Sequence, residues 1–389
     1  MIDITAKKTQ AAQTLELICQ ALELSQTQYD TAKSRYEAVG KWLSGSDDAA
    51  LRASEIYPQG SVSLGTTVKP VEADEFDVDL VCRIPFVAPH TPPSALKQLI
   101  GNRLRASGHY KDILEEKPRC WRINYANEFH LDITPSVPNA ACTNGGELVP
   151  DKKLKEWKPS NPRGYRSWFE ERALIVPRVQ SCELAFMEAR AAVEEFPKQT
   201  RRKGLLRRAV QIIKRHRDMW ACTREASIAP ISIILTTLAA KSYVHCAGNF
   251  SYETEYDLLV DIVRYMPHFI EKNMVNGREH YFIWNDTTAG ENFAEKWNQD
   301  ERLVRAFYAW QLQATSDLEN LPSLSGLDQV RSALSSSFGD SVVSKVMVEL
   351  TASISAARTT GALGIVPRSG LSATGAGRIV VPSNTFFGS

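Results

Sequence analysis

Two short segments of this chain alternate apolar with polar residues, and this pattern constrains the fold more than any other feature. In the run Phe76-Asp-Val-Asp-Leu80 and again in Phe129-His-Leu-Asp-Ile-Thr134, every second residue is apolar. Because successive side chains of a strand point to opposite faces, each run predicts a β-strand with one apolar and one polar face. The carboxylates of Asp77, Asp79 and Asp132 then lie on the polar faces.

Carboxylates that share a strand face repel one another and are stable where a divalent cation neutralises them. Oxygen ligands of this kind suit Mg²⁺, which leaves room for water and phosphate oxygens. We therefore predict that Asp77, Asp79 and Asp132 are metal ligands and catalytic residues. His130, which shares the polar face with Asp132, is interpreted as a hydrogen-bonded neighbour because that is the commoner role of a histidine on a strand.

Upstream of the first strand, the run Tyr57-Pro-Gln-Gly-Ser-Val-Ser-Leu-Gly65 predicts a loop that turns into a short helix. Ser61 is the expected N-cap of that helix. Backbone N–H groups at such a turn, with the small Gly60 and the Ser61 hydroxyl, form a site for phosphate. Each motif alone is usually a solvated strand face or an ordinary turn. Together they indicate metal-dependent nucleotidyl transfer with release of pyrophosphate.

Periodicity along the chain predicts a two-lobed protein. Apolar residues recur at helical spacing from about residue 5 to 43, which predicts one long N-terminal helix. Short alternating segments over 56–137 predict a mixed α/β core, and helical periodicity dominates from about 163 to 351. We expect three parts, namely a spine helix with nucleotidyltransferase core over 1–155, a helical lobe over 156–355 and a flexible, glycine- and proline-rich tail over 356–389.

Composition excludes several classes of protein. The 46 Lys and Arg residues balance 45 Asp and Glu residues, so no overall field draws the chain to nucleic acid or to an acidic membrane. Neither a signal-peptide core nor an apolar run long enough to span a bilayer is apparent, and the seven cysteines include no CxxC pair. A soluble, cytoplasmic protein without membrane partners is expected.

These motifs resemble a known family. Gly60-Ser61, the pair Asp77-x-Asp79 and the later Asp132 are similar to the polymerase-beta-like nucleotidyltransferase superfamily. The phrase Gln59-Gly-Ser61 followed by Glu75-Phe-Asp-Val-Asp79 resembles the bacterial cyclic-oligonucleotide synthases related to cyclic GMP-AMP synthase, the CD-NTases. Further blocks resemble the same enzymes at Leu206 to Asp218, Pro230 to Thr237 and Glu291 to Trp297, so that the resemblance covers residues 10 to 310.

The resemblance implies an α/β fold with a mixed-sheet core, a long N-terminal spine helix and a helical second lobe. It implies synthesis of a cyclic di- or trinucleotide from NTPs, ATP expected among them, with two Mg²⁺ ions that Mn²⁺ can replace. The product would serve as a second messenger in bacterial antiphage (CBASS) signalling. Nucleotide-binding roles are implied for Gln59, Gly60, Ser61, Lys214 and Ser232, and the last two contact the triphosphate from the helical lobe.

Two further implications concern partners. The His-x5-Cys-Cys zinc cluster of the animal enzyme is absent from this sequence, so activation by DNA is not implied. Many operons of the family encode ubiquitin-transfer-like partners that act on the synthase's C-terminus. The terminal segment Asn384 to Ser389, with two aromatic residues and Gly388, is therefore a candidate handle for such conjugation.

Other interpretations stay open at this point. The basic run from Arg201 to Arg217, which includes Lys214, also fits a solvated helix face. The chain also fits a superfamily member that adds nucleotides to RNA or to a protein hydroxyl, although balanced charge disfavours RNA. A non-catalytic nucleotide-binding scaffold is the third alternative, and retention of all three carboxylates disfavours it. The bases joined, the ring size and the linkage, 2′-5′ or 3′-5′, are undetermined.

Overall fold

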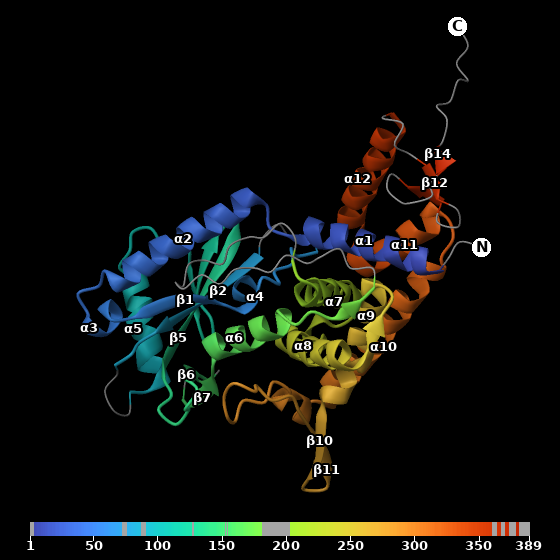
Figure 1. Cartoon of the computed structure of the whole chain (residues 1–389). Coiled ribbons are helices and arrows are strands. Elements are labelled where there is room, and N and C mark those ends of the chain that lie inside the picture. The colour runs from blue at the N-terminus through green and yellow to red at the C-terminus, as the bar shows by residue number, and fades with distance from the viewer. Residues whose placement is uncertain are drawn as a thin grey trace.

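Two lobes lie side by side in the computed structural model (Figure 1). The structure describes residues 4–71, 76–86, 91–126, 128–151, 153, 155–180 and 203–359, together with three short strands between 364 and 380. The motif residue Glu75, the start of the basic run at 201–202 and the candidate handle at 384–389 lie outside the described residues.

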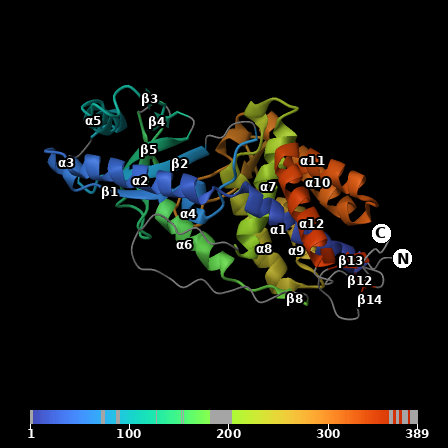
Figure 2. The ribbon, with the colours of Figure 1, turned by 90° about the horizontal axis from the view of Figure 1, so that it is seen from above.

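The N-terminal spine is two helices, so the prediction of one helix over residues 5–43 is wrong. Helix α1 spans Ile4–Leu22 and α2 spans Gln26–Ser44. The break is a capping box, in which the Ser25 hydroxyl accepts from the Gln28 backbone N–H and the Gln28 side chain accepts from the Ser25 N–H. Seen from above (Figure 2), α1 lies on the helical lobe and α2 on the sheet lobe. The break therefore falls where the spine passes between lobes.

The sheet lobe contains a mixed sheet in the order β1-β2-β5-β4-β3, extended from β5 through β6 to β7. Strands β2 and β5 are parallel, and the other neighbours are antiparallel. The strands are β1 (Glu55–Gln59), β2 (Phe76–Arg83), β3 (Leu114–Glu116), β4 (Trp121–Tyr125), β5 (Phe129–Pro138), β6 (Glu147–Pro150) and β7 (Trp157–Ser160).

One face of this sheet is covered and the other carries the polar residues. The predicted alternation is confirmed, because Phe76, Val78 and Leu80 are buried whereas Asp77 is exposed. The buried face packs with α2 and with α5 (Pro93–Arg105) in one apolar cluster. Short helices α3 (Ala49–Arg52) and α4 (Gly60–Leu64) flank β1.

The helical lobe has its own apolar core, to which α1 belongs. Helix α1, which we predicted as part of the unit over 1–155 with the sheet, therefore packs with the second lobe. The helices are α6 (Pro162–Ala173), α7 (Leu205–Ala221), α8 (Ser232–Asn249), α9 (Glu255–Tyr265), α10 (Glu301–Asn320), α11 (Leu327–Phe338) and α12 (Asp340–Thr359). Two small sheets accompany them, β8 (Arg178–Val179) with β9 (Ser251–Tyr252) and the hairpin of β10 (Glu271–Val275) with β11 (Arg278–Phe282).

The C-terminal region contains regular structure that the sequence did not predict. Helix α12 continues to Thr359, and β12 (Gly364–Val366) pairs antiparallel with β13 (Gly370–Ser372) and β14 (Ile379–Val380). The glycines and prolines beyond Thr359 disfavour a helix but are compatible with strands of two or three residues, and β12 ends directly before Pro367. Within the described part of the chain, no helix is long and apolar enough to cross a membrane.

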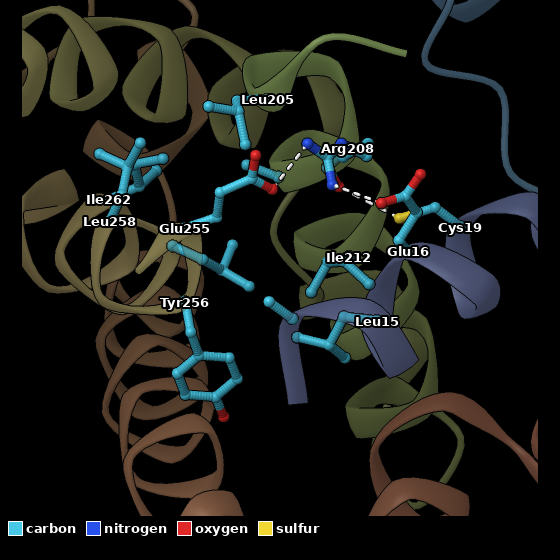
Figure 3. Close-up of a pocket in the computed structure, with 13 residues that line it drawn as sticks. Leu15, Glu16, Cys19, Leu205, Arg208, Ile212, Glu255, Tyr256, Leu258 and Ile262 are labelled. Atoms are coloured by element: carbon cyan, nitrogen blue, oxygen red, sulfur yellow. Dashed lines mark hydrogen bonds and ion pairs between the residues drawn. The ribbon is translucent and has the colours of Figure 1, made fainter. Parts of the chain in front are cut away.

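A small cavity lies between α1, α7 and α9, where Arg208 pairs with Glu16 and Glu255 (Figure 3). Apolar side chains such as Leu15 and Ile212 line the rest of it. Its volume of about 40 Å³ holds a few water molecules at most. The Arg208 network therefore joins three helices, and this cavity is too small to be the candidate active site.

Candidate active site

Strand pairing brings the three predicted carboxylates together on the polar face of the sheet. In the parallel register of β2 and β5, Asp79 lies opposite Asp132 and Asp77 lies opposite His130. The Asp77 side chain is 57% exposed, whereas that of Asp132 is 15% exposed. The His130 Nδ1 lies 3.3 Å from an Asp77 carboxylate oxygen. His130 is thus the polar neighbour of a carboxylate, as its position in the sequence indicated.

The glycine-serine turn lies directly against the deepest part of this face. Strand β1 ends at Gln59, which pairs with Asp79, and α4 begins at the next residue. Gly60 has a φ of +64°, and a Cβ there would lie 2.6 Å from the Asp79 Oδ2. Ser61 lies inside the first turn of α4 and the N-cap is Gln59, so the predicted capping role of Ser61 is wrong. Only glycine lets the turn approach the carboxylate this closely.

Helix α4 also marks the junction of the two lobes. Val62 belongs to the apolar cluster of the sheet lobe, and Leu64 belongs to the cluster of the helical lobe. Gly65 ends the helix in the left-handed conformation. The turn is therefore held by both cores at once, which fixes its position relative to residues from either lobe.

Side chains of helix α7 form hydrogen bonds with the segment that follows this turn. Four of its side chains, spaced along one face, donate hydrogen bonds to backbone carbonyls between residues 64 and 69. These are Arg207 to Leu64 (2.9 Å), Lys214 to Thr66 (2.9 Å), Gln211 to Thr67 (2.9 Å) and Arg215 to Lys69 (3.2 Å). Lys214 and Arg215 are 7% and 2% exposed. The interpretation of this run as a solvated face is wrong for these residues, because they hold the turn to the helical lobe.

Ser232 lies at the start of α8, beside the C-terminal half of α7. Its hydroxyl accepts a hydrogen bond from Arg217 (3.0 Å), which also pairs with Asp218 (2.7 Å). These three residues line an open cavity of about 480 Å³, a size typical of small-molecule sites. Lys214 lies about one turn before Arg217 and Asp218 on α7, so the structure places the two predicted triphosphate contacts on neighbouring helices.

Burial shifts the pKa of both Asp79 and Lys214 towards the neutral form. Burial, together with the charges of Asp132 and Asp77, raises the pKa of Asp79 to about 7. Burial lowers the pKa of Lys214 to about 8, and the charges of Asp218 and Asp79 act against that shift. Positive charge added beside Asp79 would therefore stabilise its ionised form.

The residues fit Mg²⁺ in chemistry, but their arrangement here is held by an arginine. Among the described residues, no group of three His, Cys, Asp or Glu side chains converges closely enough to form a ready metal site. Instead Arg122 donates two hydrogen bonds to Asp132 (2.7 and 2.8 Å) and one to Asp77 (3.2 Å). The carboxylate oxygens are nevertheless the ligands that Mg²⁺ prefers. The sequence analysis did not single out Arg122. Its strand β4 alternates like β2 and β5, because Trp121 and Ile123 are buried and Arg122 between them is half-buried.

A two-lobed fold with strand-borne aspartates against a glycine-serine turn defines a nucleotidyltransferase of the polymerase-beta-like class. Residues 10–173 match the family model described as "Second Messenger Oligonucleotide or Dinucleotide Synthetase domain". A c-di-GMP synthase of Roseivirga ehrenbergii is 32% identical over 371 residues, which is 94% of each chain. The cyclic dinucleotide synthase CdnG of Bradyrhizobium diazoefficiens is 29% identical over 342 residues, covering 81% of this chain and 77% of the relative.

Solved structures agree on the fold. The CD-NTase CdnG of Bradyrhizobium diazoefficiens in complex with GTP superposes with a TM-score of 0.66 at 22% identity, covering 90% of this chain and 99% of the other. CdnC of E. coli MS115-1 with ATP gives a TM-score of 0.62 at 14% identity, covering 84% and 97%. The chain belongs to the bacterial CD-NTases and is a nucleotidyltransferase that makes cyclic oligonucleotides.

Proposed function

We propose that this protein joins two GTP molecules into a cyclic dinucleotide in a reaction that depends on Mg²⁺ held by Asp77, Asp79 and Asp132. The observation that carries the proposal is the register of β2 and β5, which sets Asp79 opposite Asp132 and against the turn at Gly60. The relative named as a c-di-GMP synthase supports guanine as the base. ATP, the nucleotide in the E. coli CdnC structure, is the alternative substrate.

The chain's own residues would bind and orient the nucleotides. The turn at Gly60 and Ser61 and the Lys214 ammonium approach the face from opposite lobes, which suits a triphosphate between them. Bound Mg²⁺ would neutralise the phosphates and favour ionisation of the attacking hydroxyl. In each of two rounds, a ribose hydroxyl loses its proton to solvent and its oxygen bonds to an α-phosphorus, and the bond from that phosphorus to the pyrophosphate oxygen breaks. Two rounds close the ring and release two pyrophosphates.

Product analysis tests this directly. Purified protein would be incubated with GTP alone, ATP alone or both, with Mg²⁺, and phosphatase-resistant products would be identified by mass and by linkage-specific nucleases. We expect GTP alone to give a cyclic dinucleotide. A product that forms only from the mixture would overturn the choice of base. Transfer of nucleotides to added RNA, with no cyclic product, would favour the alternative function instead.

Lys214 offers a test of the triphosphate site. Replacing Lys214 by alanine should raise the apparent KM for the nucleotide by about 10- to 100-fold, because a charge-assisted contact is lost. Ser61→Ala should raise it less. Gln211→Ala is the matched control, because Gln211 makes the equivalent bond to the Thr67 carbonyl without a charge. Its apparent KM should stay near the wild-type value.

The pH dependence adds a second readout for Lys214. With a pKa of about 8 in the nucleotide-free protein, its ammonium is charged below pH 8 and loses its proton above it. Nucleotide affinity of the wild type should therefore fall above pH 8, whereas that of Lys214→Ala should change little over the same range. If the alanine variant binds nucleotide like the wild type at every pH, Lys214 has only its structural bond to Thr66.

Membership of the family supports a proposal for the cellular role. We propose that the cyclic dinucleotide is a second messenger in antiphage signalling. Conjugation of the C-terminus to a ubiquitin-transfer-like partner stays a prediction from sequence, because residues 381–389 lie outside the described part of the chain.

A further inference from the structure

Arg122 lies on β4 directly opposite Asp132 on β5. Its Nε and Nη2 donate to the two oxygens of Asp132 at 2.7 and 2.8 Å, so both carboxylate oxygens are engaged by one planar group. The Nη2 also donates to Asp77 at 3.2 Å. One guanidinium therefore links carboxylates on two strands, β2 and β5, that flank the proposed metal site.

The two contacts of Arg122 differ in strength. The bond to Asp132 is a two-point fork to a carboxylate that is 15% exposed, and such bidentate pairs are strong and directional. The bond to Asp77 is single, longer, and made to a side chain that is 57% exposed, where water competes effectively. A cation that approaches this face would therefore displace Arg122 from Asp77 before it displaced the fork.

We propose that Arg122 is a positioning residue that holds Asp132 through the fork and occupies Asp77 until metal arrives. The proposal rests on the proposed function. In the metal-free protein the guanidinium supplies the positive charge that the carboxylates require. On metal binding Asp77 is released, whereas Asp132 keeps the orientation that the fork gives it. Arg122 thus competes with metal for one ligand and aligns another.

A purely structural ion pair makes a different prediction, and the chain provides a matched control. Arg83 on β2 bridges Glu55 (2.7 Å) and Glu147 (3.6 Å) away from the three aspartates. Arg83→Gln removes a comparable bridge on the same sheet. Loss of a structural bridge lowers the melting temperature without tightening metal binding, whereas loss of a competing cation tightens it.

The experiment measures Mn²⁺ binding to nucleotide-free protein by electron paramagnetic resonance, together with turnover at saturating Mn²⁺. For Arg122→Gln we expect metal affinity to increase about tenfold, because a competing charge is removed. Turnover should fall about 100-fold, because Asp132 loses its orientation. Arg122→Lys keeps the charge but cannot fork, so its metal affinity should stay near wild type while its turnover falls. Arg83→Gln should change neither quantity.

The outcomes separate this proposal from the proposed function. If the wild type binds Mn²⁺ but Arg122→Gln binds it equally or more weakly while remaining folded by circular dichroism, the competing role of Arg122 is overturned. If turnover of Arg122→Gln stays at the wild-type level, the aligning role is overturned. If the wild type binds no Mn²⁺ even with nucleotide present, the metal-dependent function itself fails, independently of Arg122.

Discussion

Replacing Asp77 and Asp79 together by asparagine should abolish cyclic-nucleotide synthesis while leaving the protein folded. Both side chains lie on the polar face of β2, so neither contributes to the apolar core on the other face. Their proposed role is to hold the charge that stabilises the transition state, and loss of one such stabilising group typically costs about 100- to 1,000-fold. Product formation from radiolabelled GTP measures the loss of synthesis, and circular dichroism of the same samples measures whether the protein is folded.

The same variant should be more stable than the wild type at high pH when no metal is present. Burial and the neighbouring charges of Asp132 and Asp77 raise the pKa of Asp79 to about 7 in the folded protein. A raised carboxyl pKa stabilises the fold below the unfolded-state pKa, and this contribution is lost as pH rises towards 7. In EDTA at pH 8 the variant should therefore gain on the order of 2 kcal/mol, discounted for partial exposure, and near pH 4 the gain should vanish.

Glu115→Gln is the control for the double replacement of Asp77 and Asp79 by asparagine. Glu115 lies opposite Arg122 in the register of β3 and β4 and pairs with Lys117. It has no proposed metal contact, so its variant should keep near wild-type turnover. Wild-type turnover in the double aspartate variant would show that the metal assignment is wrong, and a double variant less stable than the wild type at pH 8 would contradict the electrostatic account.

The features that the sequence predicted correctly are those that a local pattern encodes. Alternation over Phe76 to Leu80 and over Phe129 to Thr134 predicted two strands and the face of each aspartate. The glycine-serine run predicted a loop entering a short helix, which is α4. Because a strand's side chains alternate with a period of two, these predictions required no knowledge of tertiary contacts.

The features that were missed depend on contacts between distant segments. The buried state of Lys214 depends on the Thr66 carbonyl, and a backbone acceptor leaves no trace in the residue pattern. The role of Arg122 depends on the pairing of β4 with β5, because its carboxylate partners lie on other strands. The break at Ser25 is different, since Ser25-x-x-Gln28 is a local capping signal that the seven-residue periodicity obscured.

Gly60→Ala should reduce turnover by about 100-fold or more, because the new methyl group would displace a catalytic carboxylate. Its Cβ would lie 2.6 Å from the Asp79 Oδ2, closer than two such atoms can approach. The carboxylate terminates a flexible side chain, so Asp79 moves and the turn stays. The left-handed φ of +64° adds a backbone cost of roughly 1 kcal/mol for any residue with a Cβ.

Gly65→Ala separates the backbone cost from the displacement of Asp79. Gly65 ends the same helix with a φ of +65°, so alanine there carries nearly the same conformational penalty. Its Cβ would meet the Arg207 side chain at 3.3 Å, and that chain can adjust. We expect both variants to lose similar stability in thermal melts, and Gly65→Ala to keep turnover within a few-fold of wild type. Equal losses of turnover would show that Gly60 acts only through its backbone conformation, whereas the expected difference would locate its effect at Asp79.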